Sequence, residues 1–280
     1  MKNNSEQSQR QERWNSYGKG RLLDIQENPN KYIIDAQASP VPPWTANICD
    51  DELITLLSPM QIHDKKILEL ACGFGDVSVW LSKQGAKVTG VDLGSDLVAT
   101  ASALATVNQV DCRFQQCNIT NLPFESDTYD IVLGLAILHH LSESDVLLAL
   151  QESCRVLKSG GIAIFLEPVE NSKLFDLIQN LFPAGTKGSP YYRPSILQRK
   201  LWNKYIRELD DRAMTNQELI VSGKRYFQHI DLVPYGFMIR LVRLIGYRYT
   251  NVLRTVDKFL FRVFPPLNFY NQTALVIYRK

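Results

Sequence analysis

The protein has 280 residues, 45% of them hydrophobic, and a formal net charge of +2. Such a chain can bury a sizeable core as one large domain, or as one domain with a cap. Its basic residues are spread out rather than gathered in a nucleic-acid-binding motif, so a nucleic-acid partner is not expected. The five cysteines form no Cys-x-x-Cys pair, and their odd number argues against a disulfide framework.

The first segment of the chain gives no targeting signal. Residues 1–13 are polar and charged, without the apolar stretch of a secretion signal. No uncharged apolar stretch is long enough to span a bilayer. We therefore expect a cytoplasmic protein, in which residues 1–45 form an N-terminal lid segment and residues 46–170 form a nucleoside-binding core.

A strand, a glycine-containing turn and a helix are predicted at the start of this core. Residues 67–70 form a short apolar run that suits a buried strand. Gly73 and Gly75 let the backbone turn sharply and leave no side chain between the main chain and a ligand. Asp76 is a good N-cap for the helix that follows, and Gly85 can end it.

The next strand, over residues 86–93, carries an acidic residue near its end. Asp92 follows Gly73 by nineteen residues. A carboxylate at this place in a doubly wound α/β sheet can accept hydrogen bonds from both hydroxyls of a ribose. The sequence therefore predicts a nucleoside site between the glycine turn and Asp92.

Two classes of cofactor compete for such a site. Dinucleotides favour a third glycine, Gly-x-Gly-x-x-Gly, but Ser78 fills that position here. Glu69 and Asp76 flank the turn, and their carboxylates would repel a diphosphate. S-adenosylmethionine carries a sulfonium and an ammonium instead. The flanking acids therefore favour the methyl donor.

The rest of the chain continues the alternation of strands and helices and then departs from it. A third strand with its loop is expected over 111–124, a fourth with its exit over 129–141, an amphipathic helix over 144–157, and a fifth strand over 162–166 that ends at Glu167. Two closing strands are expected over 226–233 and 273–278, with a helical cap inserted between them over 234–272, and with a substrate lid over 171–225.

With these segments in view, the chain resembles the class I S-adenosylmethionine-dependent methyltransferases, in the branch that acts on small molecules. The resemblance covers roughly residues 65–168. Its marks are Glu-x-Ala-Cys-Gly-x-Gly, Asp92, Asn-Ile-x-x-Leu-Pro-Phe, Asp-Ile-Val…Leu-His-His-Leu and Leu-Lys-Ser-Gly-Gly. It implies an α/β fold with a doubly wound, seven-stranded, mostly parallel sheet and an α-helical cap. It implies S-adenosyl-L-methionine as cofactor, with S-adenosyl-L-homocysteine as product.

The resemblance also assigns cofactor contacts to residues of the core. Those implied are Glu69, Ala71, Gly73 and Gly75 at the methionine part, Asp92 at the ribose, Leu93, Asn118 and Ile119 at the adenine, and Leu135 near the methionine end. Ala71 replaces the family's first loop glycine, and Asn118 stands where the family often has aspartate. Related enzymes fold an N-terminal aromatic over the cofactor, for which Tyr17 is the first candidate and Trp14 the second.

A hydroxyl acceptor also needs a base, and a histidine near neutrality suits that role. His139 is the first candidate and His140 the second, at the exit of the fourth strand, with Glu167 at the next strand end able to orient an imidazole. In some relatives the Leu-His-His-Leu histidines are only structural, so this alternative stays open. The candidates for the acceptor pocket are Tyr191, Tyr192, Arg193 and His229.

The expected function is methyl transfer to a small-molecule acceptor, most readily at a hydroxyl oxygen, without a metal. From residue 170 onward, 18 lysines and arginines stand against 8 acidic residues, which suggests an anionic partner or surface near the C-terminal part. One alternative is therefore a membrane-associated methyltransferase of a lipid or quinone, bound through its basic cap. Others are an NAD(P)-dependent oxidoreductase and a non-catalytic scaffold. The sequence leaves the oligomeric state open.

Overall fold

A computed structural model describes residues 2–36, 53, 56–169, 214–241 and 249–280. Its strands are β1 (Lys66–Leu70), β2 (Lys87–Asp92), β3 (Arg113–Gln116), β4 (Tyr129–Leu135), β5 (Leu157–Pro168), β6 (His229–Tyr235) and β7 (Thr273–Arg279). Its α-helices are α1 (Lys2–Glu27), α3 (Pro59–Ile62), α4 (Asp76–Lys83), α5 (Ser95–Asn108), α6 (Glu143–Val156), α9 (Asn216–Gly223) and α11 (Thr250–Val263). Short 3-10 helices are η1 (Pro29–Tyr32), η2 (Leu138–His140), η4 (Met238–Leu241) and η6 (Pro265–Tyr270).

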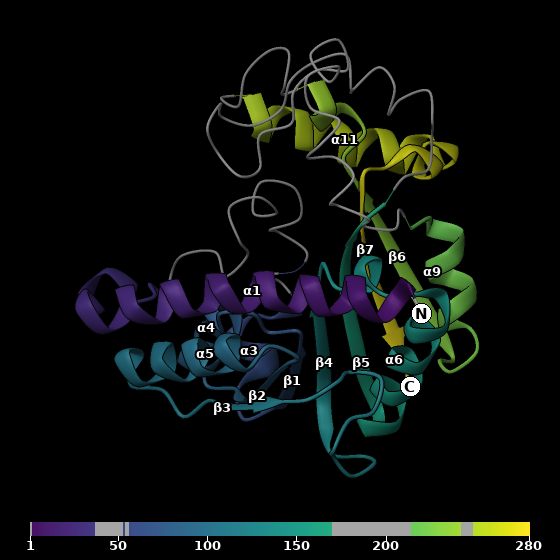
Figure 1. The fold of residues 1–280 in the computed structure, drawn as a ribbon. Helices are drawn as coiled ribbons and strands as arrows, with labels where there is room; N and C mark the ends of the chain where they lie inside the picture. The colour runs from purple at the N-terminus through teal and green to yellow at the C-terminus, as the bar shows by residue number, and fades with distance from the viewer. Residues whose placement is uncertain (1, 37–52, 54–55, 170–213, 242–248) are drawn as a thin grey trace.

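The strands form one seven-stranded sheet in the order β3-β2-β1-β4-β5-β7-β6 (Figure 1). The pairs among β1 to β5 are parallel, whereas β7 runs antiparallel to both β5 and β6. The chain crosses back at β1 and β4, so the carboxyl ends of these central strands lie at the position where an α/β sheet binds its ligands. This arrangement confirms the predicted doubly wound, mostly parallel sheet.

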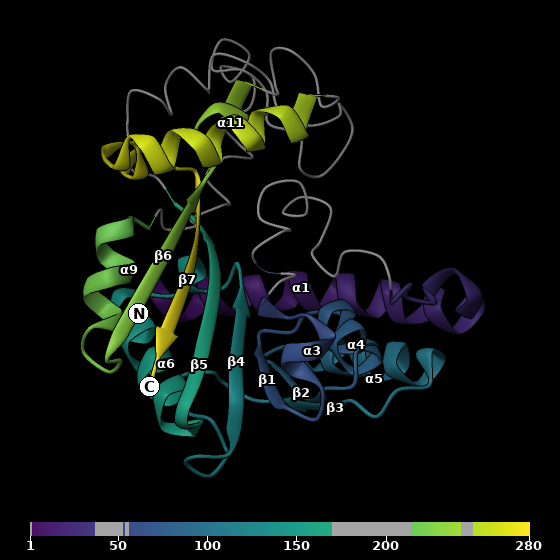
Figure 2. The same cartoon turned by 180° about the vertical axis from the view of Figure 1, so that it is seen from behind.

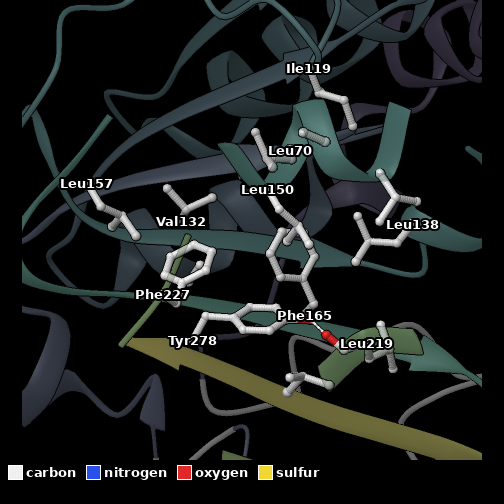
Figure 3. Close-up of a cluster of buried hydrophobic side chains, with 14 of the residues drawn as sticks. Leu70, Ile119, Val132, Leu138, Leu150, Leu157, Phe165, Leu219, Phe227 and Tyr278 are labelled. Atoms are coloured by element: carbon white, nitrogen blue, oxygen red, sulfur yellow. Dashed lines mark hydrogen bonds between the residues drawn. The ribbon is translucent and has the colours of Figure 1, made fainter. Parts of the chain in front are cut away.

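One face of the sheet packs against α6 and α9. Figure 3 shows this cluster, in which side chains from the sheet meet Leu150 of α6 and Leu219 of α9. The Tyr278 ring stacks on Phe227 with centroids 5.0 Å apart, and the Tyr278 hydroxyl donates to the carbonyl of Leu219 at 3.0 Å. That bond satisfies the polar group of a fully buried tyrosine, as burial requires.

The other face packs against α3 and α4, with buried side chains that include Ile62, Trp80 and Leu81. Because both faces are covered, the central strands are apolar on both sides: four of the five residues of β1 are buried, and β7 is buried except at its last residue. This double coverage explains why the strands read as continuous apolar runs in the sequence.

The N-terminal segment is one long helix, α1, which packs across α5 (Figure 1). The two backbones approach closely at Gly18, where an added Cβ would lie 2.9 Å from the carbonyl carbon of Asp96. Thr100 donates its hydroxyl to the carbonyl of Gly18 at 2.8 Å, and Ile25 is buried against α4 and α5. These contacts place α1 beside the glycine turn.

The segment between β6 and β7 contains η4, α11 and η6. The helical cap expected over 234–272 contains the α-helix α11, which Pro265 and Pro266 follow. Nearer to β6, Met238–Leu241 form a 3-10 helix. Figures 1 and 2 show α11 beyond the end of the sheet at which β6 ends and β7 begins.

The expected lid over 171–225 lies outside the described residues up to residue 213. Its last part is not a lid, because α9 packs against α6 and the closing strands. The predicted end of this segment at residue 225 is therefore wrong. Among the described residues, none of the helices combines the length and the apolar character needed to cross a bilayer.

Candidate functional site

The glycine turn between β1 and α4 is held to the end of β2 by Asp92. One carboxylate oxygen of Asp92 accepts from the backbone N–H of Gly73 and the other from that of Gly94, each at 2.9 Å. Burial raises the pKa of Asp92, and the backbone N–H groups oppose that rise. A carboxylate has about four acceptor positions; the backbone N–H groups of Gly73, Gly94 and Leu93 face this one, so at least one position remains for a hydroxyl of a ribose.

The two glycines of the turn have left-handed backbones, with φ of +54° at Gly73 and +82° at Gly75. A Cβ on Gly75 would lie 2.7 Å from the Cβ of Ala101, so this glycine allows α5 to approach. A Cβ on Gly73 would meet nothing within 4 Å. The space above Gly73 is thus open to a ligand. Gly75 is the last residue before α4 and occupies its N-cap position, so the prediction of Asp76 as N-cap was wrong by one residue.

Ala71, at the start of the turn, is also left-handed, with φ of +51°. This conformation is strained for a residue with a Cβ and costs about 1 kcal/mol. It explains why the family prefers glycine at this place. Ala71 nevertheless adopts the left-handed backbone that this turn requires.

Glu69 points from β1 into a buried polar pair. Its side chain accepts a hydrogen bond from the hydroxyl of Ser78, and the residue is only 4% exposed. Burial raises the pKa of Glu69 to about 8, and the charges of Asp76 and Asp92 add to the rise. Ser78, which fills the third glycine position of the dinucleotide motif, therefore serves to hold Glu69.

Asp76 is paired with a basic residue of α1. Its carboxylate accepts from the Arg21 guanidinium at 2.5 Å, and the same guanidinium lies 4.6 Å from the ring centroid of Phe74. The argument that two free carboxylates flank the turn is therefore wrong in part. Asp76 is paired with Arg21, and the raised pKa of Glu69 favours its protonated form.

The residues predicted to contact the adenine (Leu93, Asn118 and Ile119) and the methionine end (Leu135) lie in different surroundings. Leu93 is 36% exposed directly after β2, and Leu135, at the end of β4, is half-buried. Ile119 is buried in the core, so only its backbone is available to a ligand. Asn118 is exposed, and its side-chain oxygen accepts from the backbone N–H of Thr120 at 3.0 Å. A second lone pair of that oxygen remains for a ligand.

The aromatic residues of α1 lie on the same flank as Arg21. Tyr17 is one helical turn before Arg21, and its ring centroid is 6.0 Å from that of Trp14. Both aromatic rings are exposed. Because Arg21 contacts the glycine turn, Tyr17 is near enough to remain a candidate for covering a cofactor.

His139 and Glu167 meet at the carboxyl ends of β4 and β5. Nδ1 of His139 lies 2.8 Å from a carboxylate oxygen of Glu167, whose side chain is fully buried. Glu167 also accepts from the backbone N–H groups of Ile137 and Leu138 at 2.9 Å and of His139 at 3.3 Å. The carboxylate therefore fixes both the backbone of η2 and the ring of His139.

The second histidine stacks beside the first. The rings of His139 and His140 have centroids 3.9 Å apart. His139 is buried, whereas His140 is half-buried. Nδ1 of His139 faces the Glu167 carboxylate, which orders the ring, so His139 is the first candidate for the base.

The pair and the glycine turn lie at the same edge of the sheet. Leu70 pairs with Gly134, and Leu135 pairs with Leu166, so β1, β4 and β5 end side by side. Two strand spacings separate β1 from β5, about 10 Å. The geometry thus brings together a nucleoside cradle and a histidine–carboxylate pair.

Not every predicted residue reaches this edge. Tyr191, Tyr192 and Arg193 lie outside the described residues. His229 is the first residue of β6 and pairs with Arg279 of β7, which in turn pairs with Ile162 of β5. Ile162 precedes Glu167 by five residues along β5. This separation is about 16 Å and places His229 at the opposite edge, so the prediction that it lines the acceptor pocket was wrong.

Two functional contacts were missed in the sequence. Arg21 lies 55 residues from Asp76, and nothing local predicts that they pair. The Ser78 contact had a signal in the sequence. Ser78 follows Glu69 by nine residues, and from the helix after the glycine turn its hydroxyl reaches the buried carboxyl group of Glu69. Within the described ranges, no three His, Cys, Asp or Glu side chains gather closely enough to hold a metal ion; the expectation that no metal is needed stays a prediction.

Comparison with known sequences agrees with this geometry. Residues 67–161 match the family model of a methyltransferase domain. An uncharacterized protein of Haemophilus influenzae is 38% identical over 105 residues, which are 36% of this chain and 42% of that protein. A ubiquinone biosynthesis O-methyltransferase of Coxiella burnetii is 29% identical over 157 residues, 53% of this chain and 66% of that enzyme. The chain thus spans less than two thirds of the length of these relatives.

Solved structures share the fold. A protein of Pyrococcus horikoshii has a TM-score of 0.54 at 17% identity, with 89% of this chain and 94% of that chain covered. An S-adenosylmethionine-dependent methyltransferase from Mesorhizobium loti has a TM-score of 0.51 at 16% identity, with coverages of 82% and 96%. Residues 67–161 thus match a methyltransferase domain, and the glycine turn, Asp92 and the sheet order are those expected of the class I S-adenosylmethionine-dependent methyltransferases that the sequence resembles.

Proposed function

We propose that this protein transfers a methyl group from S-adenosylmethionine to a hydroxyl oxygen of a small-molecule acceptor, with His139 as general base. The observation that carries the proposal is the 2.8 Å hydrogen bond between His139 and the buried Glu167. It lies at the strand edge that also holds the glycine turn. A nucleoside cradle and an ordered imidazole at one edge suit group transfer to an acidic hydroxyl.

The residues of the turn suit the methyl donor. Gly73 leaves open space at the backbone, and Asp92 keeps acceptor capacity for a ribose hydroxyl. Glu69 lies beneath the turn, and a cation nearby would favour its ionised form. When bound, S-adenosylmethionine supplies an electrophilic methyl group on a sulfonium. We infer that Tyr17, on the flank of α1 beside the turn, covers the cofactor.

The role of His139 follows from its hydrogen bond. In the neutral ring, Nδ1–H donates to Glu167, which leaves the lone pair on Nε2 to accept the proton of the acceptor hydroxyl. The charged ring that results is stabilised by the buried carboxylate. Glu167 touches His139 rather than the acceptor, and is therefore a positioning residue. The ring of His140 lies against that of His139 at an interplanar angle of 42°.

The comparisons support the class of acceptor. The Coxiella burnetii relative is named as a ubiquinone biosynthesis O-methyltransferase, an enzyme that methylates oxygen. The chain covers 66% of that enzyme's length, so its acceptor is taken here only as a guide to chemistry. The nicotinamide alternative is disfavoured by Ser78, which removes the third glycine of that motif and binds Glu69 instead.

Calorimetry tests the cofactor assignment. We expect heat on adding S-adenosylhomocysteine and none on adding NADH. The matched variant is Gly73→Ala, which fills the open space above the turn and should abolish the heat while the protein stays folded. Heat with NADH and silence with S-adenosylhomocysteine would overturn the proposal.

Turnover tests the base. With labelled S-adenosylmethionine and catechol as a probe acceptor, His139→Gln should lower kcat about 10²–10⁴-fold, while S-adenosylhomocysteine affinity stays unchanged. His140→Gln is the matched control and should lower kcat by less than about tenfold. Full turnover in His139→Gln would leave His139 a structural residue.

A further inference from the structure

The outer face of α11 exposes a continuous apolar stripe. Val252, Val256, Phe259 and Val263 are 61%, 36%, 63% and 50% exposed. Their spacings of four, three and four residues place them on one face of the helix. The stripe extends over eleven residue steps, about 16 Å. Isolated exposed apolar residues are ordinary, but a contiguous row of them marks an interaction surface.

The stripe is not the face by which α11 packs on the protein. Leu253 and Asp257 are 7% and 4% exposed, and they lie on a different side of the helix. The Asp257 carboxylate accepts from the backbone N–H of Met238, which anchors α11 to the chain directly after β6. The helix is therefore fixed by one face and presents a second apolar face outward.

Two basic side chains of α11 are exposed to solvent, whereas its acidic side chain is buried. Lys258 and Arg262 are exposed, and at 3.6 residues per turn they lie along one margin of the stripe. Asp257, the acidic residue of α11, is buried. Basic side chains beside an apolar stripe are the pattern of a helix that lies in the interface of a lipid bilayer.

Aromatic residues extend the apolar surface beyond α11. Phe264 and Phe269 are each 60% exposed, at the end of the helix and within η6. Together with Phe259, they give three exposed phenylalanine rings in one C-terminal segment. We name the side chains of Val252, Val256, Phe259, Val263, Phe264 and Phe269 the α11 surface.

The α11 surface belongs to the edge of the sheet at which the candidate site lies. Glu167 of β5 pairs with Ala274 of β7, and Ala274 pairs in turn with Pro234 near the end of β6. The end of β6 is therefore two strand spacings from Glu167, about 10 Å. Figure 2 shows α11 beyond this edge. A body bound to the α11 surface would be close to the acceptor side of the site.

We propose that the α11 surface docks the protein on the surface of an anionic lipid bilayer. The basic margin of Lys258 and Arg262 complements anionic headgroups, while the valine and phenylalanine side chains enter the headgroup–acyl boundary. A second copy of the chain suits this surface less well, because two such faces would bring like charges together. Resting on the proposed function, the same docking implies an acceptor dissolved in the membrane.

Vesicle flotation tests the docking with the full chain and no acceptor. We expect the protein to float with vesicles of phosphatidylcholine and phosphatidylglycerol at roughly 2:1, and about tenfold less with phosphatidylcholine alone. The double variant Phe259→Ser with Val263→Ser should lower vesicle affinity at least about tenfold. Lys258→Gln with Arg262→Gln should remove the preference for phosphatidylglycerol and the sensitivity to salt.

The matched controls are exposed apolar residues on other helices. Leu148 of α6 and Val221 of α9 are 44% and 46% exposed, and Leu148→Ser and Val221→Ser should float like the wild type. Circular dichroism of every variant checks that the fold is kept. Equal losses in the controls and in the α11 variant, or no flotation of the wild type, would overturn the docking. The docking would also be overturned if the wild type formed a dimer in sedimentation velocity, Phe259→Ser dissociated that dimer, and the protein did not bind vesicles.

This test is separate from that of the proposed function. A protein that binds S-adenosylhomocysteine but does not float refutes only the membrane surface. A protein that floats through α11 but binds no S-adenosylhomocysteine refutes only the methyl transfer. Where both hold, turnover of a hydroxylated quinol in vesicles should fall in the α11 variant, while turnover of catechol in solution stays unchanged.

Discussion

Two buried carboxylates organise two regions of this molecule in similar ways and leave them with different capacities. Asp92 accepts two backbone N–H groups at the glycine turn, and Glu167 accepts three at the end of β4. Glu167 also accepts from the ring of His139, which occupies its last lone pair. Asp92 can therefore still bind a ligand directly, whereas Glu167 can only hold protein groups in place.

Replacing these two acids should separate binding from positioning, and this is the largest effect that we expect. Asp92→Asn removes the charge and replaces one of the two acceptor oxygens by an NH₂ donor, so affinity for S-adenosylhomocysteine should fall about 100-fold. Glu167→Gln should leave that affinity unchanged and lower kcat instead. Calorimetry and a turnover assay on both variants measure the two effects. Equal losses of affinity in the two would contradict the distinction.

A second comparison lies within the glycine turn itself. Gly75→Ala should lower the free energy of unfolding by about 3 kcal/mol, because its Cβ would collide with Ala101 in a left-handed backbone. Gly73→Ala meets no atom and should lower it by only about 1 kcal/mol, from backbone strain alone. Denaturant unfolding of both variants gives the two values. Similar losses would show that the space above Gly73 is not open.

The smallest expected effect is a dependence of stability on pH. The pKa of Glu69 in the folded protein, about 8, lies above its ordinary value of 4.5. The folded state therefore binds the proton more tightly, and the stability this gives is complete below about pH 4.5 and is lost as the pH rises through 8. We expect the free energy of unfolding to fall across that window in the ligand-free protein.

Glu69→Gln tests the source of this dependence, because a glutamine cannot titrate. Its unfolding free energy should change less than that of the wild type between about pH 5 and pH 8. Ser78→Ala is a useful second variant, since it removes the hydroxyl that donates to Glu69 and should raise the pKa further. A wild type and Glu69→Gln with parallel pH curves would assign the dependence to another group.

The sequence predicts much of the fold because the central strands are buried on both faces, so each of them is a continuous apolar run that can be recognised in the sequence. It also predicts that His139 and Glu167 approach each other, since the carboxyl ends of adjacent parallel strands meet at one edge. Neither step needs long-range information. The same reasoning places Gly73 after β1 and Asp92 at the end of β2.

The errors arise where local patterns do not contain the answer. The strand expected over 226–233 begins three residues later, at His229. Phe227, which precedes it, is not part of the strand, and its ring stacks on Tyr278. His229 consequently lies at the amino end of its strand. The charge argument at the turn failed in part because Arg21 reaches Asp76 from a helix 55 residues away. The apolar face of α11 became evident only when its packed side was known.

The saturation of Glu167 has a further consequence for the catalytic cycle proposed here. With each of its acceptor positions occupied by an N–H group, this carboxylate cannot relay a proton onward. A proton gained by His139 at Nε2 must leave by the same nitrogen, through the face of the ring that met the acceptor. Recovery of the base between turnovers thus waits for the methylated product to depart and for water to enter, so that product release and deprotonation become one event.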